Sequence, residues 1–192
     1  MKVDYIIVGL GLAGIAFVEE LIEAGKSFLV FEDNSQSSSL VAGGVYNPVI
    51  LKRFTPVWNA KKQLEVALPF YKKIEDRLDI KIDKKFVIKK AFKSIEDQNN
   101  WFTALDKPKL IDYLDPILDN QSYNGVIADF CFGNVNETGR IDTHKLVESY
   151  RDYLKEKNLI RFENFKHQQI IFNKDDVTYN NIGKQRLPNT SS

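Results

Sequence analysis

The stretch Val3-Asp4-Tyr5-Ile6-Ile7-Val8-Gly9-Leu10-Gly11-Leu12-Ala13-Gly14 decides the fold of this 192-residue chain. It begins as a short buried strand over residues 5–8 and runs directly into the pattern Gly-x-Gly-x-x-Gly. Gly9 permits the tight turn, Gly11 lets the backbone approach a pyrophosphate, and Gly14 lets the following helix pack closely on its strands. The N-terminus of that helix offers N–H groups to the phosphates. The stretch therefore predicts a dinucleotide-binding βαβ unit.

A second apolar run, residues 28–31, completes this unit and is followed by an acid, Glu32. Between the two runs, residues 11–24 have the spacing of an amphipathic helix, and Gly25 fits its C-terminal stop. Glu32 lies near the spacing of roughly 20 residues at which an acid hydrogen-bonds the ribose. We expect the helix to bury one set of side chains and expose its acids. The buried set is Ala13, Ala16, Phe17 and Leu21, and the exposed acids are Glu19, Glu20 and Glu23.

The composition is that of an ordinary soluble globular protein, with 43% hydrophobic and 28% charged residues. A net charge of +1 gives no reason to expect nucleic acid or an anionic membrane as a partner. The single cysteine, Cys131, excludes an intramolecular disulfide framework and favours a reducing, cytoplasmic location. Asp4 and the pair Glu19-Glu20 argue against a signal peptide, and the uncharged run over residues 5–18 is too short to span a bilayer.

The rest of the chain holds a second glycine segment and several predicted elements. Residues 40–48, Leu-Val-Ala-Gly-Gly-Val-Tyr-Asn-Pro, place paired glycines among apolar residues, which favours a backbone lying flat against a buried ligand over a flexible loop. Apolar spacing predicts helices over residues 56–78, with Trp58 in the core, over 95–105, and from 142 to 158. It predicts strands over residues 125–132 and 159–162 and a hairpin over 170–179.

Four of these segments together resemble the D-amino-acid-oxidase-like superfamily. They are residues 4–14, Glu32, the segment 39–48 with its Ala-Gly-Gly-x-x-Asn-Pro ending, and Gly139-Arg140-Ile141-Asp142 before a helix. This superfamily comprises FAD-dependent oxidoreductases, among them glycine and D-amino-acid oxidases. The resemblance covers most of the chain, but only the first 50 residues carry specific motifs.

The resemblance implies an α/β fold, in which a Rossmann-like FAD-binding βαβ domain carries part of an inserted antiparallel α+β substrate domain. We expect the FAD domain over residues 1–55 and 139–182 and the partial substrate domain over 56–138. The polar end, residues 183–192, is expected to be a disordered tail. The pyrophosphate would lie on the first glycine loop, the ribose hydroxyls on Glu32, and the flavin along the second glycine segment. The implied FAD-binding residues are Gly9, Gly11, Ala13, Gly14, Glu32, Asp33, Ser39, Ala42, Gly43, Gly44 and Val45.

The chain also departs from that family. Its members are typically much longer, with a later Gly-rich segment on the flavin and substrate-anchoring residues in the second half. This chain ends without such a segment, so we expect an N-terminal or truncated form.

The catalytic residues stay unassigned, because a flavin performs the hard chemical step and needs no triad. Lys52 and Arg53 could approach a flavin or a substrate carboxylate or could form a plain surface pair. Tyr46 could border the flavin or pack in the core. The two histidines and Cys131 lack the spacing of metal ligands, and Cys131 is interpreted as an inert thiol.

Three functions compete at this point. The first is an FAD-dependent oxidoreductase acting on a small amine or amino acid. The second is a non-catalytic remnant of such a flavoprotein, and the third is a compact NAD-binding dehydrogenase. Glu32 does not separate FAD from NAD, since both carry the same ribose. The glycine segment after the second strand favours FAD, and the sequence does not specify the substrate.

Overall fold

The computed structural model describes residues 2–35, 38–126, 128–174 and 176–179, which form two compact units. The first unit comprises residues 1–37 and 154–192, and the second comprises residues 38–153. The division falls inside helix α5 (Thr143–Glu156). These limits differ from the domains expected from the sequence, residues 1–55 with 139–182 and residues 56–138. The expected domains stay a prediction. The expected disordered tail, residues 183–192, lies outside the described residues.

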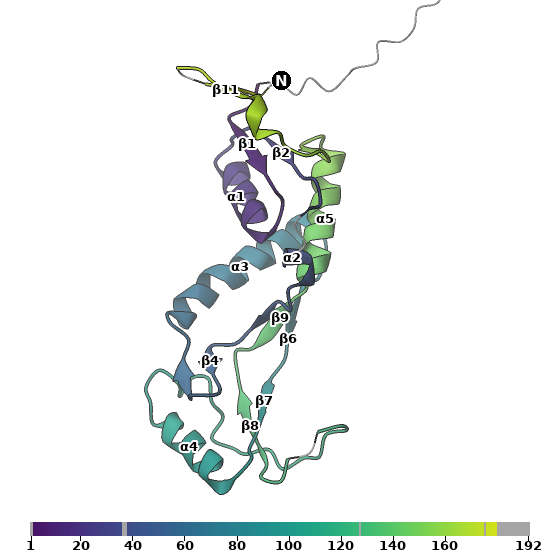
Figure 1. Ribbon diagram of the computed structural model, residues 1–192. Helices are drawn as coiled ribbons and strands as arrows, with labels where there is room; N and C mark the ends of the chain where they lie inside the picture. Colours follow the sequence, from purple (N-terminus) through teal and green to yellow (C-terminus); the bar gives the residue numbers. More distant parts are fainter. Residues whose placement is uncertain (1, 36–37, 127, 175, 180–192) are drawn as a thin grey trace, which may run out of the picture. The chain divides into compact units, whose positions relative to one another are not determined.

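The first unit is built on a parallel three-stranded sheet in the order β1-β2-β10. Its strands are β1 (Tyr5–Val8), β2 (Phe28–Phe31) and β10 (Ile160–Arg161), and α1 (Leu12–Glu23) connects the first two (Figure 1). The register pairs Tyr5 with Phe28 and Val8 with Phe31. The predicted βαβ unit is therefore confirmed. The central strand β2 is buried at every position, whereas β1 buries only Ile7, because it lies at the edge of the sheet formed by the described strands.

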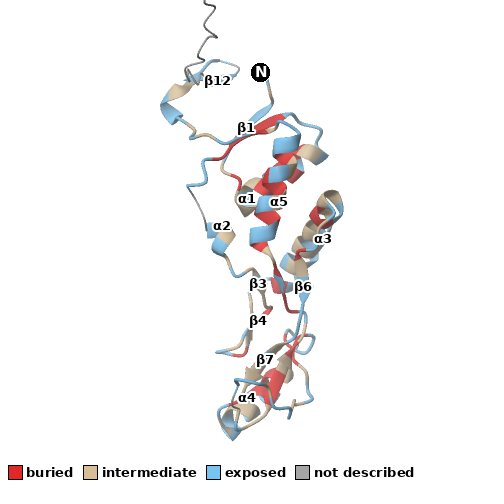
Figure 2. Ribbon diagram, turned by 90° about the vertical axis from the view of Figure 1, so that its right-hand side faces the viewer, coloured by how far each residue is buried: buried red, intermediate tan, exposed pale blue. Residues whose placement is uncertain are grey.

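Helix α1 lies within the predicted residues 11–24, one residue shorter at each end, but buries a different face. Its buried residues are Ile15, Val18, Glu19 and Leu21, whereas Ala13 and Phe17 are exposed. The predicted buried face was wrong at these positions, as was the exposure of Glu19. The reason lies at Gly14, which must face the turn after β1, because a Cβ there would stand 2.3 Å from the backbone oxygen of Gly9. Figure 2 colours the described residues by how far each is buried.

The predicted hairpin over residues 170–179 is confirmed. A short 3₁₀ turn, η1 (His167–Gln169), leads into β11 (Ile170–Phe172), which pairs antiparallel with β12 (Val177–Tyr179). The ring of Tyr179 stacks on Phe165, with centroids 4.3 Å apart, and meets Phe31 of β2 edge-on at 5.1 Å. This aromatic contact holds the hairpin against the end of the parallel sheet.

The second unit combines antiparallel strands with helices. One sheet has the order β3-β9-β6, and two further pairs are β4 with β5 and β7 with β8. The strands are β3 (Val45–Tyr46), β4 (Val49–Ile50), β5 (Thr55–Pro56), β6 (Asp83–Lys85), β7 (Ile88–Ala91), β8 (Phe132–Val135) and β9 (Gly139–Ile141). The helices are α2 (Ser38–Val41), α3 (Ala60–Leu78), α4 (Ile95–Leu105) and α5.

A core around Trp101 stabilises the second unit. The Trp101 ring is fully buried and meets the rings of Phe54 and Phe92 edge-on. Its indole N–H donates to the backbone oxygen of Asp115 at 3.1 Å. Helix α4, which carries Trp101, has the predicted bounds and is capped by Ser94, whose side chain accepts the backbone N–H of Asp97.

Two predicted elements of the second unit were wrong in part. The helix expected from residue 56 begins at Ala60, because Asn59 before it has a left-handed backbone (φ 53°). Trp58 therefore precedes the helix and is 82% exposed instead of lying in the core. Of the described residues in the strand expected over 125–132, only Phe132 belongs to a strand, since Cys131 also has a positive φ of 53° and interrupts the extended backbone; residue 127 lies outside the described residues.

Candidate nucleotide site

The first glycine loop joins the carboxyl end of β1 to the start of α1. Gly9 has a φ of +90°, which favours glycine, and its N–H donates to the backbone oxygen of Phe31 at 2.8 Å. Gly11 is the N-cap of α1, and the first turn of this helix contains no acidic residue. The close approach of Gly14 to Gly9 leaves no room for a side chain. The loop thus places the positive end of the helix dipole beside the end of the sheet, which suits a phosphate.

The carboxylate of Glu32 lies beside this loop and is only 5% exposed. Its Oε2 accepts a hydrogen bond from the backbone N–H of Leu10 at 2.6 Å. Its Oε1 accepts from the backbone N–H of Asn34 at 2.8 Å. The predicted acid therefore lies at the expected place, and it ties the glycine loop to the segment that follows β2.

Asp33 is exposed at the same end of the sheet. Its Oδ1 accepts the backbone N–H of Ser35 at 2.9 Å, and its Oδ2 accepts from the side-chain amide of Asn164 at 2.7 Å. Hydrogen bonds from Ser35, and secondarily from Asn164, hold the pKa of Asp33 below its usual value. Sequence reasoning missed Asn164. The signal that could have found it is its position shortly after β10, since ligands of parallel sheets bind at the carboxyl ends of the strands.

The second group of predicted residues, Ser39 and residues 42–45, lies in the other unit. Gly44 has a φ of +66°, and a Cβ there would stand 2.0 Å from the backbone oxygen of Ile141. The oxygen of Ala42 accepts the hydroxyl of Thr143 at 3.0 Å. Packing against the start of α5 and the end of β9 thus explains part of the Ala-Gly-Gly pattern. At Gly43, in contrast, no atom lies within 4 Å of the position that a Cβ would take, so its backbone is open to a ligand.

Tyr46 is held within the second unit. Its hydroxyl donates to Asp83 Oδ1 at 2.8 Å, and its ring lies beneath the ammonium of Lys85 at 5.1 Å. Burial, opposed by a hydrogen bond from Lys85, raises the pKa of Tyr46. A Cβ on Gly139 would meet the Tyr46 hydroxyl at 2.2 Å, so the tyrosine packs directly on β9. These contacts favour the packing role over a place beside a flavin.

The remaining candidates form no chemical site. Lys52 and Arg53 are exposed in the turn after β4. Among the residues that the structure describes, no three His, Cys, Asp or Glu side chains gather to hold a metal ion. In the same residues, no helix is long and apolar enough to cross a membrane.

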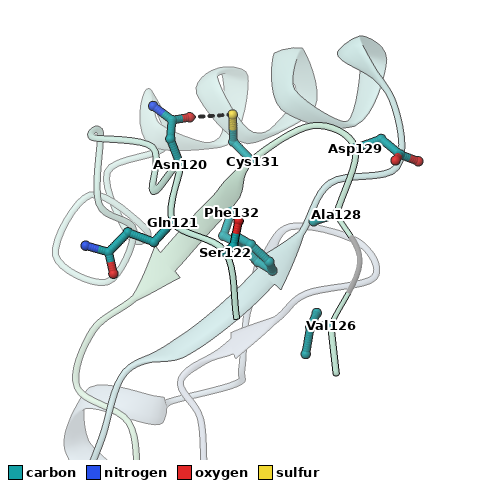
Figure 3. A pocket seen from close by; sticks show the side chains of 8 residues that line it. All are labelled: Asn120, Gln121, Ser122, Val126, Ala128, Asp129, Cys131 and Phe132. Carbon is teal, nitrogen blue, oxygen red and sulfur yellow. Dashed lines mark hydrogen bonds between the residues drawn. The ribbon is translucent and has the colours of Figure 1, made fainter. Parts of the chain in front are cut away.

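A hollow of about 430 Å³ lies in the second unit (Figure 3). Figure 3 shows Asn120, Gln121, Ser122, Cys131 and Phe132 on one side of it and Val126, Ala128 and Asp129 on the other. The half-buried thiol of Cys131 donates to Asn120 Oδ1 at 2.6 Å. The polar lining of the hollow is mostly exposed.

Comparison with known proteins shows the fold. No protein-family model matches the chain. Glycine oxidase from Bacillus cereus is similar in structure, with a TM-score of 0.62 at 16% identity over 92% of this chain and 52% of the oxidase. L-amino acid deaminase from Proteus vulgaris has a TM-score of 0.59 at 18% identity, over 83% of this chain and 39% of the deaminase. L-proline dehydrogenase from P. horikoshii has a TM-score of 0.58 at 14% identity, over 92% of this chain and 48% of the dehydrogenase.

The chain therefore has the mixed α/β fold of amino-acid oxidases and deaminases, with a parallel sheet in its first unit. It spans about half the length of these solved chains or less.

Proposed function

We propose that this chain binds FAD through its first glycine loop and forms the FAD-binding part of an oxidoreductase that acts on a small amine or amino acid. The observation that carries the proposal is the loop itself. Gly9, at the carboxyl end of β1, and Gly14, in the first turn of α1, lie so close that no side chain fits at Gly14, and Glu32 accepts the N–H of Leu10 in the same loop. This arrangement suits the pyrophosphate and ribose of a dinucleotide.

The residues present fit such a cofactor. Gly9, Gly11, Ala13 and Gly14 would receive the pyrophosphate, and Glu32 and Asp33 would face the ribose. Ser39, Ala42, Gly43, Gly44 and Val45 would follow the cofactor toward its flavin, and the open backbone at Gly43 is consistent with this. When bound, the flavin supplies the hydride-accepting chemistry, while this chain binds and orients it.

The substrate class is proposed from the fold. The similar structures include a glycine oxidase, an L-amino acid deaminase and an L-proline dehydrogenase, whose names all refer to amino acids. We propose the same class here, with catalytic residues unassigned. A cytoplasmic location, expected from the single cysteine, is part of this proposal.

A non-catalytic FAD-binding domain is the second candidate. In that case the cofactor binds but nothing is oxidised.

A reconstitution experiment tests the proposal. The purified chain is mixed with excess FAD and passed through a desalting column, and the visible spectrum of the protein peak is recorded. Retained flavin absorbance supports the proposal, whereas a colourless protein contradicts it. Tight binding of NADH, followed by its fluorescence, would indicate a compact NAD-binding protein instead. Reduction of the retained flavin by an amino acid under anaerobic conditions separates an enzyme from a non-catalytic domain.

A further inference from the structure

We infer that Glu32 is a positioning residue that holds the first glycine loop in its pyrophosphate-binding shape through the backbone N–H of Leu10. The inference deepens the proposed function and rests on it. It adds a role to Glu32 beyond a contact with the ribose, because the carboxylate acts here on the protein backbone before any nucleotide is present.

The first step of the argument is how the loop is held. The N–H groups of two consecutive residues, Gly9 and Leu10, donate to two consecutive residues at the end of β2. Gly9 donates to the backbone oxygen of Phe31 at 2.8 Å, and Leu10 donates to Glu32 Oε2 at 2.6 Å. The acceptor of the first hydrogen bond is the backbone oxygen of Phe31, and the acceptor of the second is the side chain of Glu32.

The second step is the burial of this contact. Leu10 is fully buried and Glu32 is 5% exposed, so water does not readily replace the carboxylate. Leu10 also lies between Gly9 and Gly11, the positions with the greatest backbone freedom. A strong hydrogen bond at the residue between two glycines removes freedom that the loop would otherwise lose on binding a ligand.

The third step is the second oxygen of the carboxylate. Glu32 Oε1 accepts the N–H of Asn34, whose φ is 59°. Both oxygens therefore act as acceptors of backbone N–H groups. A glutamine at this position could accept only one of these bonds, since its NH₂ group would face the other N–H.

The negative charge of Glu32 makes the direction of the change in nucleotide affinity informative. A carboxylate close to a pyrophosphate repels it, so neutralising Glu32 without any change in the loop would strengthen the binding of an anion. The positioning role predicts weaker binding of the anion instead, because the loop loses its shape when Glu32 loses one of the two hydrogen bonds that it accepts from the backbone.

The experiment compares binding of ADP and of 2′,3′-dideoxy-ADP to the full chain by calorimetry. We expect Glu32→Gln to weaken the binding of both nucleotides about tenfold. The control is Glu20→Gln, which makes the same charge change at an exposed position of α1 and should leave both affinities unchanged. Weaker binding of ADP with unchanged binding of the dideoxy nucleotide would indicate a ribose contact alone and would overturn the inference. Unchanged or stronger binding of both would also overturn it.

A second readout needs no ligand and separates this inference from the proposed function. In the free chain, amide hydrogen exchange at Leu10 should be faster in Glu32→Gln than in the wild type, and unchanged exchange would contradict the positioning role. If Glu32→Gln fails to fold, Glu32→Asp serves instead, because its shorter side chain cannot reach both N–H groups. Failure of the wild-type chain to bind ADP would contradict the proposed function, while the exchange result would still decide the role of Glu32.

Discussion

Gly14 of α1 lies so close to Gly9 that a Cβ on Gly14 would stand 2.3 Å from the backbone oxygen of Gly9. This single contact sets the rotation of the helix about its axis and explains why Val18 and Leu21 face the sheet. It also fixes where the start of α1 lies relative to the turn that carries Gly9.

Replacing Gly14 by alanine should destabilise the chain by about 1–3 kcal/mol, because the added methyl group forces the helix away from the turn. Helix propensity alone predicts the opposite sign, a gain of about 1 kcal/mol for alanine over glycine in a helix. Urea unfolding of Gly14→Ala and wild type measures the difference. A more stable variant would show that the contact with Gly9 is not as close as described.

The neighbouring glycines Gly43 and Gly44 provide a matched pair. Gly44→Ala should destabilise the chain by about 1–3 kcal/mol, since its φ is +66° and its Cβ would meet the oxygen of Ile141 at 2.0 Å. Gly43→Ala should change the stability by less than about 0.5 kcal/mol, because no atom lies within 4 Å of its Cβ. Thermal unfolding of the two variants checks the contrast, and equal effects would contradict it.

The two tryptophans should report opposite environments. Trp58 is 82% exposed and Trp101 is fully buried. In Trp58→Phe, the remaining emission should therefore be blue-shifted, with stability within about 0.5 kcal/mol of wild type. In Trp101→Phe, the emission should be that of a solvated indole, and stability should fall by about 1–3 kcal/mol because the oxygen of Asp115 loses its donor. Similar spectra for the two variants would refute this assignment.

Asp119 should stay ionised to unusually low pH. Hydrogen bonds from the Lys89 ammonium and then from the Tyr123 hydroxyl lower the pKa of Asp119 to about 2, from 3.8. Since the folded pKa is the lower one, the interaction stabilises the fold above pH 3.8 and is lost as the pH falls from about 4 toward 2. Carbon-13 NMR of the carboxyl group measures the midpoint.

The control for Asp119 compares two lysines. Lys89→Gln should move the midpoint of Asp119 up toward 3.8, whereas Lys84→Gln, at an exposed position of β6, should leave it near 2. A wild-type midpoint at the ordinary value would rule out the network of Lys89, Asp119 and Tyr123.

Local patterns predicted much of the fold, and the errors lie where a close backbone contact or a positive φ outweighs the apolar pattern. Residues 95–105 were predicted correctly because the apolar spacing of the helix lies within the segment itself. The buried face of α1 was wrong because the contact between Gly14 and Gly9 outweighs the apolar pattern. The strand expected over residues 125–132 failed at the positive φ of Cys131, which alternation does not reveal.

The candidate site shows the same division between local and long-range information. The glycine loop and Glu32 could be predicted, since their spacing along the chain follows from the βαβ unit. The position of Asn164 after β10 could mark it as a candidate, but its bond to Asp33 could not be predicted, because the two residues are 131 positions apart. The hydrogen bond from Thr143 to Ala42 joins residues 101 positions apart, and the sequence pattern does not predict it either.

The central claim is that the chain binds the diphosphate of a dinucleotide at its first glycine loop. Titration of the nitrogen-15-labelled chain with ADP, followed by backbone amide NMR, tests it most directly. The account predicts that the amide signals of Gly9, Gly11 and Ala13 shift in a saturable manner and that those around Cys131 do not. An absence of shifts, or shifts confined to the hollow beside Cys131, would contradict it.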